Sequence, residues 1–244
     1  MDIYKSLANG YDLLQPKEEI FKQKSFFEEI IRKYKIKTCL DCACGTGWHL
    51  FMLDDIGLKC YGSDISNEML NIAKDNLKEK NIILKKGDFK SLDKIWKIKF
   101  DVIICMSTSL PHMISNLDVM ASLESMYYQL NDNGILIIDN GISDKLIKNK
   151  PTFIPARILK NSAFYFFLEY PNTKKIIFNI LQVNKTKNSF DQKFYSTSYN
   201  AIGKSKFDKY FQKTDFKNIS YFDDFKFSSY SVRNSDRLVV LAQK

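Results

Sequence analysis

Short apolar segments alternate with helical patterns in the first 140 residues, and this alternation limits the possible folds more than any other feature. The apolar segments are rich in Val, Ile, Leu and Cys, as expected for strands buried on both faces. Strands of this kind that are separated by helices form a parallel sheet. The predicted strands are 37–43, 58–65, 81–88, 100–107 and 134–140, and the predicted helices are 17–35, 48–56, 66–80 and 116–130.

Two of these helices have recognisable start signals. Pro16 precedes the pattern at 17–35, and proline suits the start of a helix. Ser66 and Asn67 stand at the start of the helical pattern at 66–80, and both residue types are good N-caps. We therefore expect helices to begin directly after these positions.

The alternation stops near residue 142 and resumes near residue 203. Between these points, turn-rich stretches (PNTK and NKTKNS) separate three extended segments, which indicates antiparallel strands. The extended segments are 156–170, 174–185 and 190–200, and a helix near 203–214 and strands at 216–223 and 236–244 follow.

These segments predict an α/β fold with a doubly wound, seven-stranded sheet and an antiparallel β-sheet inserted after strand five. Residues 1–142 and 201–244 would form the main domain, and residues 143–200 the insertion. A chain of 244 residues is long enough for one such domain with a proper core.

The charge balance favours a solvated lysine surface over a nucleic-acid interface. The net charge is +9, yet only four of the 37 basic residues are arginine, the residue type that recognises phosphate and guanine bidentately. The lysines are scattered along the chain among Ile, Asn, Phe and Tyr. We therefore expect no nucleic-acid partner.

The five cysteines indicate reduced thiols in a cytoplasmic core. Their number is odd, and most lie in strand-like segments. Cys39, Cys42 and Cys44 form a C-x2-C-x-C pattern, but a strand turns alternate residues to opposite faces, so we expect no metal site. The N-terminal sequence has no charged and apolar leader pattern, and no apolar run is long enough for a membrane span.

The segment LDCACGTGWHL, residues 40–50, places two glycines between the first strand and the next helix. Gly45 and Gly47 can adopt positive φ and let a ligand approach the backbone closely. The carboxyl ends of the strands of a doubly wound sheet are where nucleotides bind. The sequence therefore predicts a binding loop here.

Acidic residues follow the next two strands. Asp64 lies 17 residues after Gly47, near the spacing at which an acid meets ribose hydroxyls, and Asp88 follows the third strand. Neither G-x-G-x-x-G nor Gly-Lys-Ser/Thr is present, and the loop has an aspartate but no lysine. This pattern suits a positively charged nucleoside ligand without phosphates, such as S-adenosylmethionine.

Together these motifs resemble those of the class I S-adenosylmethionine-dependent methyltransferases. LDCACGTGWHL is similar to motif I, GSDISNEML to motif II, GDF to the adenine-contacting motif and FDVIICMSTSLPHM to motif IV. The resemblance covers residues 36–140 and is greatest to glycine and sarcosine N-methyltransferases and amino-sugar N,N-dimethyltransferases. It implies a Rossmann-like fold, S-adenosylmethionine as cofactor and S-adenosylhomocysteine as product.

The resemblance also implies the positions of the site residues. The catalytic candidates are His112, after the fourth strand, and Tyr11, which resembles tyrosines that close over the cofactor. The substrate-binding candidates are Tyr4, Ser107, Thr108, His112, Asn140 and Arg157. The cofactor-binding candidates are Tyr11, Asp41, Cys42, Ala43, Cys44, Gly45, Thr46, Gly47, His49, Asp64, Ile65, Met69, Gly87, Asp88, Phe89, Cys105, Met106 and Ser107.

One departure from the family pattern bears on the acceptor. Glycine N-methyltransferases carry an arginine two residues after the strand-five aspartate, and Gly141 occupies that position here. Recognition of an acceptor carboxylate would then need another residue, for which Arg157 is a candidate.

Two alternatives to a small-molecule N-methyltransferase stay open at the level of sequence. The basic surface would suit an RNA or protein methyltransferase, and a cofactor-binding scaffold without activity would keep the same loop. The Ser-rich segment MSTSLPHM favours a small amine acceptor, because hydroxyls and an imidazole make a neutral polar pocket. We expect a cytoplasmic monomer or homodimer.

Overall fold

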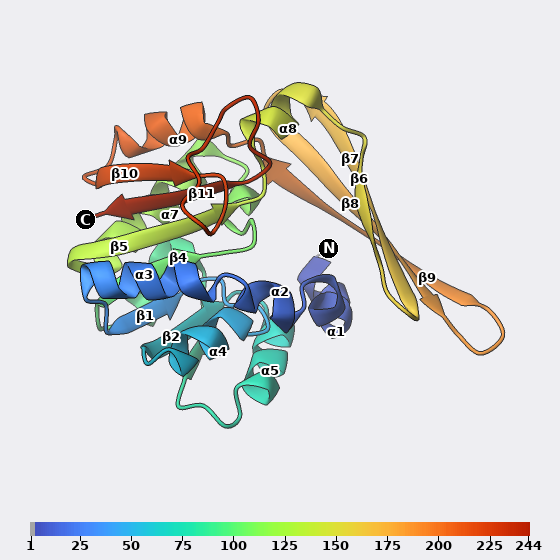
Figure 1. The fold of residues 1–244 in the computed structure, drawn as a ribbon, viewed down its shortest axis with the longest axis horizontal. Coiled ribbons are helices and arrows are strands. Elements are labelled where there is room, and N and C mark those ends of the chain that lie inside the picture. The colour runs from blue at the N-terminus through green and yellow to red at the C-terminus, as the bar shows by residue number, and fades with distance from the viewer. Residues whose placement is uncertain (1–2) are drawn as a thin grey trace.

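The chain folds around a seven-stranded sheet with the strand order β10-β11-β5-β4-β1-β2-β3 (Figure 1). The computed structural model describes the backbone of residues 3–244 and the side chains of residues 7, 8 and 10–244. All neighbours in this sheet are parallel except at β11, which is antiparallel to β5 and to β10. The strands are β1 Thr38–Asp41, β2 Lys59–Asp64, β3 Ile83–Lys86, β4 Phe100–Cys105, β5 Leu130–Asn140, β10 Lys217–Phe222 and β11 Leu238–Gln243. The predicted doubly wound fold is confirmed.

Helices cover both faces of the sheet and enclose two apolar cores. One core contains Leu40 of β1 and the other contains its neighbour Cys39, because successive strand residues point to opposite faces. The helices are α1 Ile3–Leu14, α2 Lys17–Phe21, α3 Lys24–Tyr34, α4 Trp48–Asp55, α5 Asn67–Asn76, α6 Leu92–Ile95, α7 Asn116–Gln129, α8 Asp144–Asn149 and α9 Lys204–Phe211, with short 3₁₀ turns at η1 Phe89–Ser91 and η2 Leu110–His112.

The predicted helix starts are confirmed, but one predicted helix is divided. α2 begins directly after Pro16, and the Ser66 Oγ atom caps α5 by accepting from the Met69 N–H at 3.3 Å. The helix expected at 17–35 is interrupted at residues 22–23, so α2 and α3 are separate. The interruption lets Ile20 face the candidate site while Phe26 packs against Phe227, with ring centroids 4.6 Å apart.

The inserted segment forms a second, four-stranded antiparallel sheet with the order β6-β7-β8-β9. Its strands are β6 Phe153–Ile158, β7 Ser162–Asn172, β8 Lys175–Lys185 and β9 Phe190–Asn200. The predicted segment 156–170 is therefore parts of two strands. Figure 1 shows this sheet extending away from the main sheet, with α1 close to one of its faces.

Helix α1 connects the inserted sheet to the rest of the molecule. Leu7 of α1 is buried against Phe164, Ile180 and Tyr195 of the inserted sheet. Burial of these side chains is the apolar contact that fixes the inserted sheet beside the carboxyl ends of the main strands.

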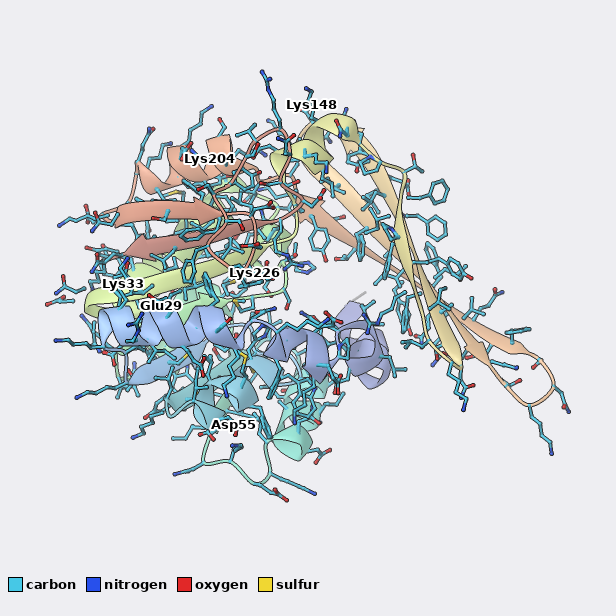
Figure 2. All side chains as sticks on the ribbon, in the orientation of Figure 1. Glu29, Lys33, Asp55, Lys148, Lys204 and Lys226 are labelled. Carbon is cyan, nitrogen blue, oxygen red and sulfur yellow. The ribbon has the colours of Figure 1, made fainter. Side chains whose placement is uncertain are left out.

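The cysteines of the C-x2-C-x-C pattern lie apart from one another, and the labelled lysines lie on separate helices. Cys39 and Cys44 lie in one core cluster and Cys42 in the other, so the three thiols of the C-x2-C-x-C pattern do not converge. Lysines labelled in Figure 2 extend from separate helices, Lys33 from α3, Lys148 from α8 and Lys204 from α9. Of the helices in the described residues, none has the length and apolar character needed to cross a membrane.

Candidate functional site

A cavity of about 840 Å³, including its open mouth, lies at the carboxyl ends of β1, β2, β3 and β4, and we call it the loop cavity. It is located at the topological switch point where doubly wound sheets bind ligands. It is lined by Tyr11, Gln15, Ile20, Cys42, Ala43, Cys44, Gly45, Thr46, Trp48, His49, Asp64, Ile65, Met69, Gly87, Asp88, Phe89, Met106, Ser107, Ser109, His112 and Met113.

The glycine loop adopts the backbone conformation that its sequence predicts. Gly45 has φ of 51° and Gly47 has φ of 90°, both in the left-handed region. A Cβ atom on Gly47 would lie 2.8 Å from Leu77 Cδ1, so the packing of α5 also requires glycine at this position. The loop therefore brings its backbone close to the cavity.

Asp64 ties the glycine loop to the end of β2. Its Oδ2 atom accepts from the Gly45 N–H at 2.9 Å and its Oδ1 atom accepts from the Ser66 N–H at 2.8 Å. The carboxylate also lines the loop cavity, where a ligand diol would meet it. Asp88 has a similar double role, because it lines the cavity and accepts from the Lys90 N–H at 2.9 Å.

The Asp41 carboxyl group lies buried behind the glycine loop. It is 1 % exposed, and burial raises its pKa to about 8. Its Oδ1 atom accepts from the Ala43 N–H at 3.2 Å, whereas no described residue donates a hydrogen bond to its Oδ2 atom. A buried carboxylate oxygen without a partner is costly, and a cationic ligand in this cavity would stabilise its ionised form.

The part of the cavity wall next to Asp64 is apolar. Ile65 directly follows Asp64 and is 59 % exposed, and Met69 and Phe89 lie on the same cavity. Apolar side chains beside a carboxylate suit a nucleoside, whose base needs apolar contacts and whose ribose needs an acceptor. The lining of the cavity thus fits S-adenosylmethionine, with the Asp64 carboxylate on the cavity wall and the Asp41 carboxyl group behind the glycine loop.

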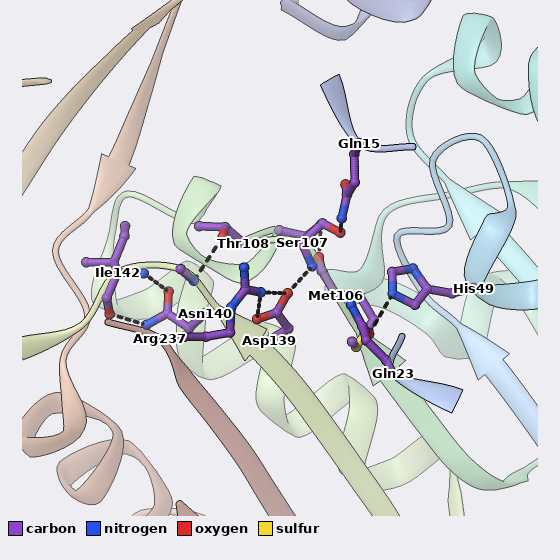
Figure 3. Close-up of polar contacts among 12 residues, drawn as sticks. Gln15, Gln23, His49, Met106, Ser107, Thr108, Asp139, Asn140, Ile142 and Arg237 are labelled. Atoms are coloured by element: carbon purple, nitrogen blue, oxygen red, sulfur yellow. Dashed lines mark hydrogen bonds and ion pairs between the residues drawn. The ribbon is translucent and has the colours of Figure 1, made fainter. Parts of the chain in front are cut away.

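Helix α1 closes the loop cavity through a chain of hydrogen bonds that the sequence did not predict. The Tyr11 hydroxyl donates to Gln15 Oε1 at 3.0 Å. Gln15 Nε2 donates to Ser107 Oγ at 2.7 Å (Figure 3). Tyr11 is half-buried, and desolvation of its hydroxyl raises the pKa of the phenol, which therefore stays protonated. No sequence motif surrounds Gln15. Its hydrogen bond to Ser107 depends on how α1 packs against the turn after β4, so sequence patterns did not predict it.

The turn after β4 is strained and is held by Asp139 of β5. Ser107 and Thr108 have φ of 55° and 63°, which costs about 1 kcal/mol or more for each residue. The Asp139 carboxylate accepts from the Ser107 N–H at 3.0 Å, and its own backbone oxygen accepts from the Thr108 N–H at 3.0 Å. Arg237 in turn donates from Nη1 to both Asp139 carboxylate oxygens, at 2.6 and 2.7 Å (Figure 3).

A second cavity, the aromatic cavity, lies between this turn and the inserted sheet. Its volume is about 860 Å³ including the open mouth, and it shares Tyr11, Gln15 and Ser107 with the loop cavity. It is lined by Leu7, Tyr11, Leu14, Gln15, Ser107, Thr108, Asp139, Phe166, Phe178, Ile180, Tyr199 and Arg237.

His112 and His49 occupy different environments. His112 ends η2 and lines the loop cavity; its Nδ1 atom lies 3.4 Å from Thr197 Oγ1, and its ring centroid lies 4.7 Å from that of Tyr199. His49 is 5 % exposed in the first turn of α4, where burial lowers its pKa to about 4. His49 is therefore neutral, and His112 is the imidazole near the inserted sheet.

Most predicted cofactor residues line the loop cavity, but Asp41, Gly47 and Cys105 do not. Asp41 and Gly47 support the loop from behind, as described above, and Cys105 is fully buried in a core cluster. The sequence motif predicts that the whole loop binds the cofactor. It does not distinguish the residues that line the cavity from those that support the loop.

Two predicted substrate residues, Asn140 and Arg157, line neither cavity. Asn140 is fully buried, and its Nδ2 atom donates to Ile142 O at 2.8 Å and to Ile202 O at 2.7 Å, so it joins the two ends of the insertion. Arg157 lies in a separate surface groove, where its Nε atom donates to Leu13 O at 2.9 Å. Tyr4 belongs to α1, and its side chain is outside the described residues.

Gly141 cannot be replaced by an arginine without rearrangement. A Cβ atom at this position would lie 2.7 Å from Thr108 Oγ1, which itself accepts from the Gly141 N–H at 2.9 Å. The pairing of Leu238 with Asn140 places Arg237 across from Gly141 on the neighbouring strand. The guanidinium near this part of the site therefore belongs to Arg237, the residue before β11. Sequence patterns did not predict this residue.

Comparison with known proteins gives a matching domain and a similar fold. Residues 39–134 match a methyltransferase domain model. A solved S-adenosylmethionine-dependent methyltransferase from Clostridium acetobutylicum superposes with a TM-score of 0.83 at 19% identity, covering 98% of each chain. The strand order, the glycine loop and the acids at its edge agree with these matches. The chain thus contains a methyltransferase domain match and has the fold of a solved S-adenosylmethionine-dependent methyltransferase.

By sequence, the chain is similar over about half its length to N-methyltransferases of small molecules. It is 33% identical to a glycine/sarcosine N-methyltransferase of Aphanothece halophytica over 52% of this chain and 51% of that protein. It is 27% identical to a dTDP-3-amino-3,6-dideoxy-alpha-D-glucopyranose N,N-dimethyltransferase of Streptomyces fradiae over 54% and 52% of the two chains. The aligned region thus spans about half the length of these relatives.

Proposed function

We propose that the protein transfers a methyl group from S-adenosylmethionine to an amine nitrogen of a small molecule. The observation that carries the proposal is the contact between the two cavities at Tyr11, Gln15 and Ser107. A cofactor in the loop cavity and an acceptor in the aromatic cavity would meet at these residues. The relatives named above act on glycine, sarcosine or an amino sugar according to their names, which also supports an amine acceptor.

The proposed division of labour follows from the chemistry of the lining residues. When bound, S-adenosylmethionine supplies a methyl group on a positively charged sulfur, which an unprotonated amine takes up with release of S-adenosylhomocysteine. Asp64 and the glycine loop would hold the nucleoside, and the inserted sheet would exclude water from the acceptor. These residues therefore act mainly by positioning.

A proton must leave an ammonium acceptor before its nitrogen can attack. We assign this proton to the His112 imidazole, which lines the loop cavity and is held by Thr197 and Tyr199 of β9. Tyr11 is a poorer base, because its raised pKa keeps the phenol protonated. Its hydroxyl would instead orient Gln15 and through it Ser107.

The test is incubation with labelled S-adenosylmethionine and a panel of amines, hydroxy compounds and RNA, with the product identified by mass. We expect label on an amine nitrogen and turnover that rises with pH as the acceptor loses its proton. His112→Ala should lower turnover about 100-fold if the imidazole is the general base. Selective labelling of a hydroxyl or of RNA would overturn the amine assignment.

A further inference from the structure

Arg237 places a guanidinium at the edge of the proposed acceptor site. It immediately precedes β11, and it lines both the aromatic cavity and a surface groove formed by α2 and the loop after β10. Its side chain is 43% exposed, whereas that of its partner Asp139 is 1% exposed. The arginine is therefore the member of this ion pair that a ligand can reach.

Only part of the hydrogen-bonding capacity of Arg237 is used within the chain. Both hydrogen bonds to Asp139 come from Nη1, and no described residue accepts from Nε or Nη2. These two nitrogens form the side of the guanidinium that matches two oxygens of one anion. The neighbouring Asp139 charge raises the pKa of Arg237, so the group stays cationic.

A ligand in the aromatic cavity can reach the Arg237 guanidinium but not the buried Asp139 carboxylate. That carboxylate already accepts from Ser107 N–H and from Arg237 Nη1. Among the residues that line the aromatic cavity, Asp139 and Arg237 are the two with charged side chains. The accessible charge of the cavity is thus positive, and its remaining polar lining is neutral.

The rest of the cavity suits an apolar body. Phe166 and Phe178 are stacked with ring centroids 5.6 Å apart, and Ile180, Leu14 and Tyr199 complete the wall. Apolar walls strengthen an ion pair with a ligand because they exclude water from it. A site with these walls and one anion-binding arginine favours an acceptor that is both apolar and anionic.

We propose that Arg237 binds a carboxylate of the methyl acceptor, and that the acceptor is an amino acid with an apolar or aromatic side chain. This assignment rests on the proposed N-methyltransferase function. In this arrangement the amine lies toward Ser107 and His112, the carboxylate contacts Nε and Nη2 of Arg237, and the side chain packs on the Phe166 and Phe178 rings.

A phosphate-bearing amine is the competing anion. The adjoining surface groove contains three other cations, Lys22, Arg157 and Lys226, but none of them lines the aromatic cavity. Lys22 pairs with Glu19 at 2.8 Å, and Arg157 donates from Nε to Leu13 O. A single arginine at an apolar cavity matches one carboxylate better than a phosphate group, which would be served by several cations. The carboxylate is therefore the assignment we test.

The experiment compares matched acceptors in three proteins. Leucine and 3-methylbutylamine, and phenylalanine and 2-phenylethylamine, differ only in the carboxylate, and phosphoethanolamine presents a phosphate. The proteins are wild type, Arg237→Lys and Arg233→Gln. Arg237→Lys keeps a cation beside Asp139 but loses the paired nitrogens, and Arg233→Gln removes one charge from an exposed position in the same loop. Cofactor affinity and the melting temperature of each protein establish that the folded site is intact.

We expect wild type to prefer each amino acid over its amine at least 10-fold in kcat/KM. Arg237→Lys should lower kcat/KM for the amino acids 10- to 100-fold through KM while leaving the matched amines within 3-fold, and Arg233→Gln should behave as wild type. Equal losses for both members of a pair would show that Arg237 only supports Asp139, and would overturn the proposal. A preference for phosphoethanolamine over every carboxylate would also overturn it.

Failure of the proposed function gives a different result. If no amine is methylated, calorimetry of leucine and phenylalanine with the S-adenosylhomocysteine complex still tests Arg237. Binding that is lost in Arg237→Lys but retained in Arg233→Gln would support the carboxylate site without the reaction. Absence of binding to wild type would refute it.

Discussion

The Asp64 carboxylate holds the glycine loop and also lines the loop cavity. It accepts from the Gly45 and Ser66 backbone N–H groups, and the resemblance of its segment to motif II predicts that it binds the ribose of S-adenosylmethionine. Asp64→Ala should therefore weaken binding of S-adenosylmethionine and S-adenosylhomocysteine by about 2 to 4 kcal/mol, because charge-assisted hydrogen bonds are lost. Isothermal titration calorimetry measures this directly, with Asp75→Ala as an exposed control on α5. Wild-type affinity in Asp64→Ala would refute the ribose assignment.

His49 links the stability of the fold to pH. Burial lowers its pKa to about 4 in the folded protein, whereas an unfolded histidine titrates near 6.5. The unfolded state thus binds more protons between these values, so stability is fully present above about pH 6.5 and is lost as pH falls toward 4. The loss should reach about 2 to 3 kcal/mol near pH 4.5.

The measurement is urea unfolding of wild type and His49→Gln, without cofactor, from pH 4.5 to 7. Glutamine keeps a side-chain partner for Gln23, which now lies 3.2 Å from His49 Nε2. Asp41 contributes the opposite pH dependence, because its folded pKa is raised, but both proteins contain it and the difference removes it. A pH-independent difference between the two proteins would contradict the neutral buried histidine.

Sequence patterns locate site residues that follow a strand directly and miss those that arrive through tertiary packing. Asp64 and Asp88 each come at or just after a strand end, so the alternation of elements was enough to place them at one edge of the sheet. Arg237 reaches the site because β11 pairs with β5, and Gln15 because α1 docks on the turn after β4. No local pattern around either residue carries that information.

At the scale of elements, helix α1 is also a feature that local sequence patterns do not predict. Its sequence has a glycine at position 10 and no acidic residue in its first turn, so local signals for a helix are weak. The helix is stabilised by its contact with the inserted sheet, where Leu7 is 1 % exposed. Tertiary burial thus determines this helix, and α8 was likewise not predicted.

Leu7→Ala should destabilise the protein by about 2 to 5 kcal/mol, because it leaves a cavity between α1 and the inserted sheet. Leu13→Ala is the matched control on the same helix, since Leu13 is 44% exposed and should cost less than about 0.5 kcal/mol. Chemical unfolding of both variants provides the comparison. Equal effects would show that α1 does not depend on the inserted sheet.

At the scale of the whole molecule, the two cavities draw on different parts of the chain. Every residue that lines the loop cavity lies outside positions 143–200, whereas Phe166, Phe178, Ile180 and Tyr199 of the aromatic cavity lie inside them. The insertion leaves and rejoins the main fold at one point, where Asn140 Nδ2 binds both Ile142 O and Ile202 O. This geometry implies that cofactor binding and acceptor binding are separable.

Replacing residues 143–200 by a short Gly-Ser linker should therefore abolish methyl transfer while S-adenosylhomocysteine binding stays measurable. Binding should weaken, because α1 loses the partner of Leu7 and carries Tyr11 and Gln15 of the loop cavity. Replacing only the hairpin tip at positions 186–189 by two glycines is the control and should preserve turnover, since those residues line neither cavity. Calorimetry and a labelled-methyl assay on both proteins separate the two functions. Loss of all folded structure in the larger deletion would mean that the insertion belongs to the core, and full turnover would remove the inserted sheet from the acceptor site.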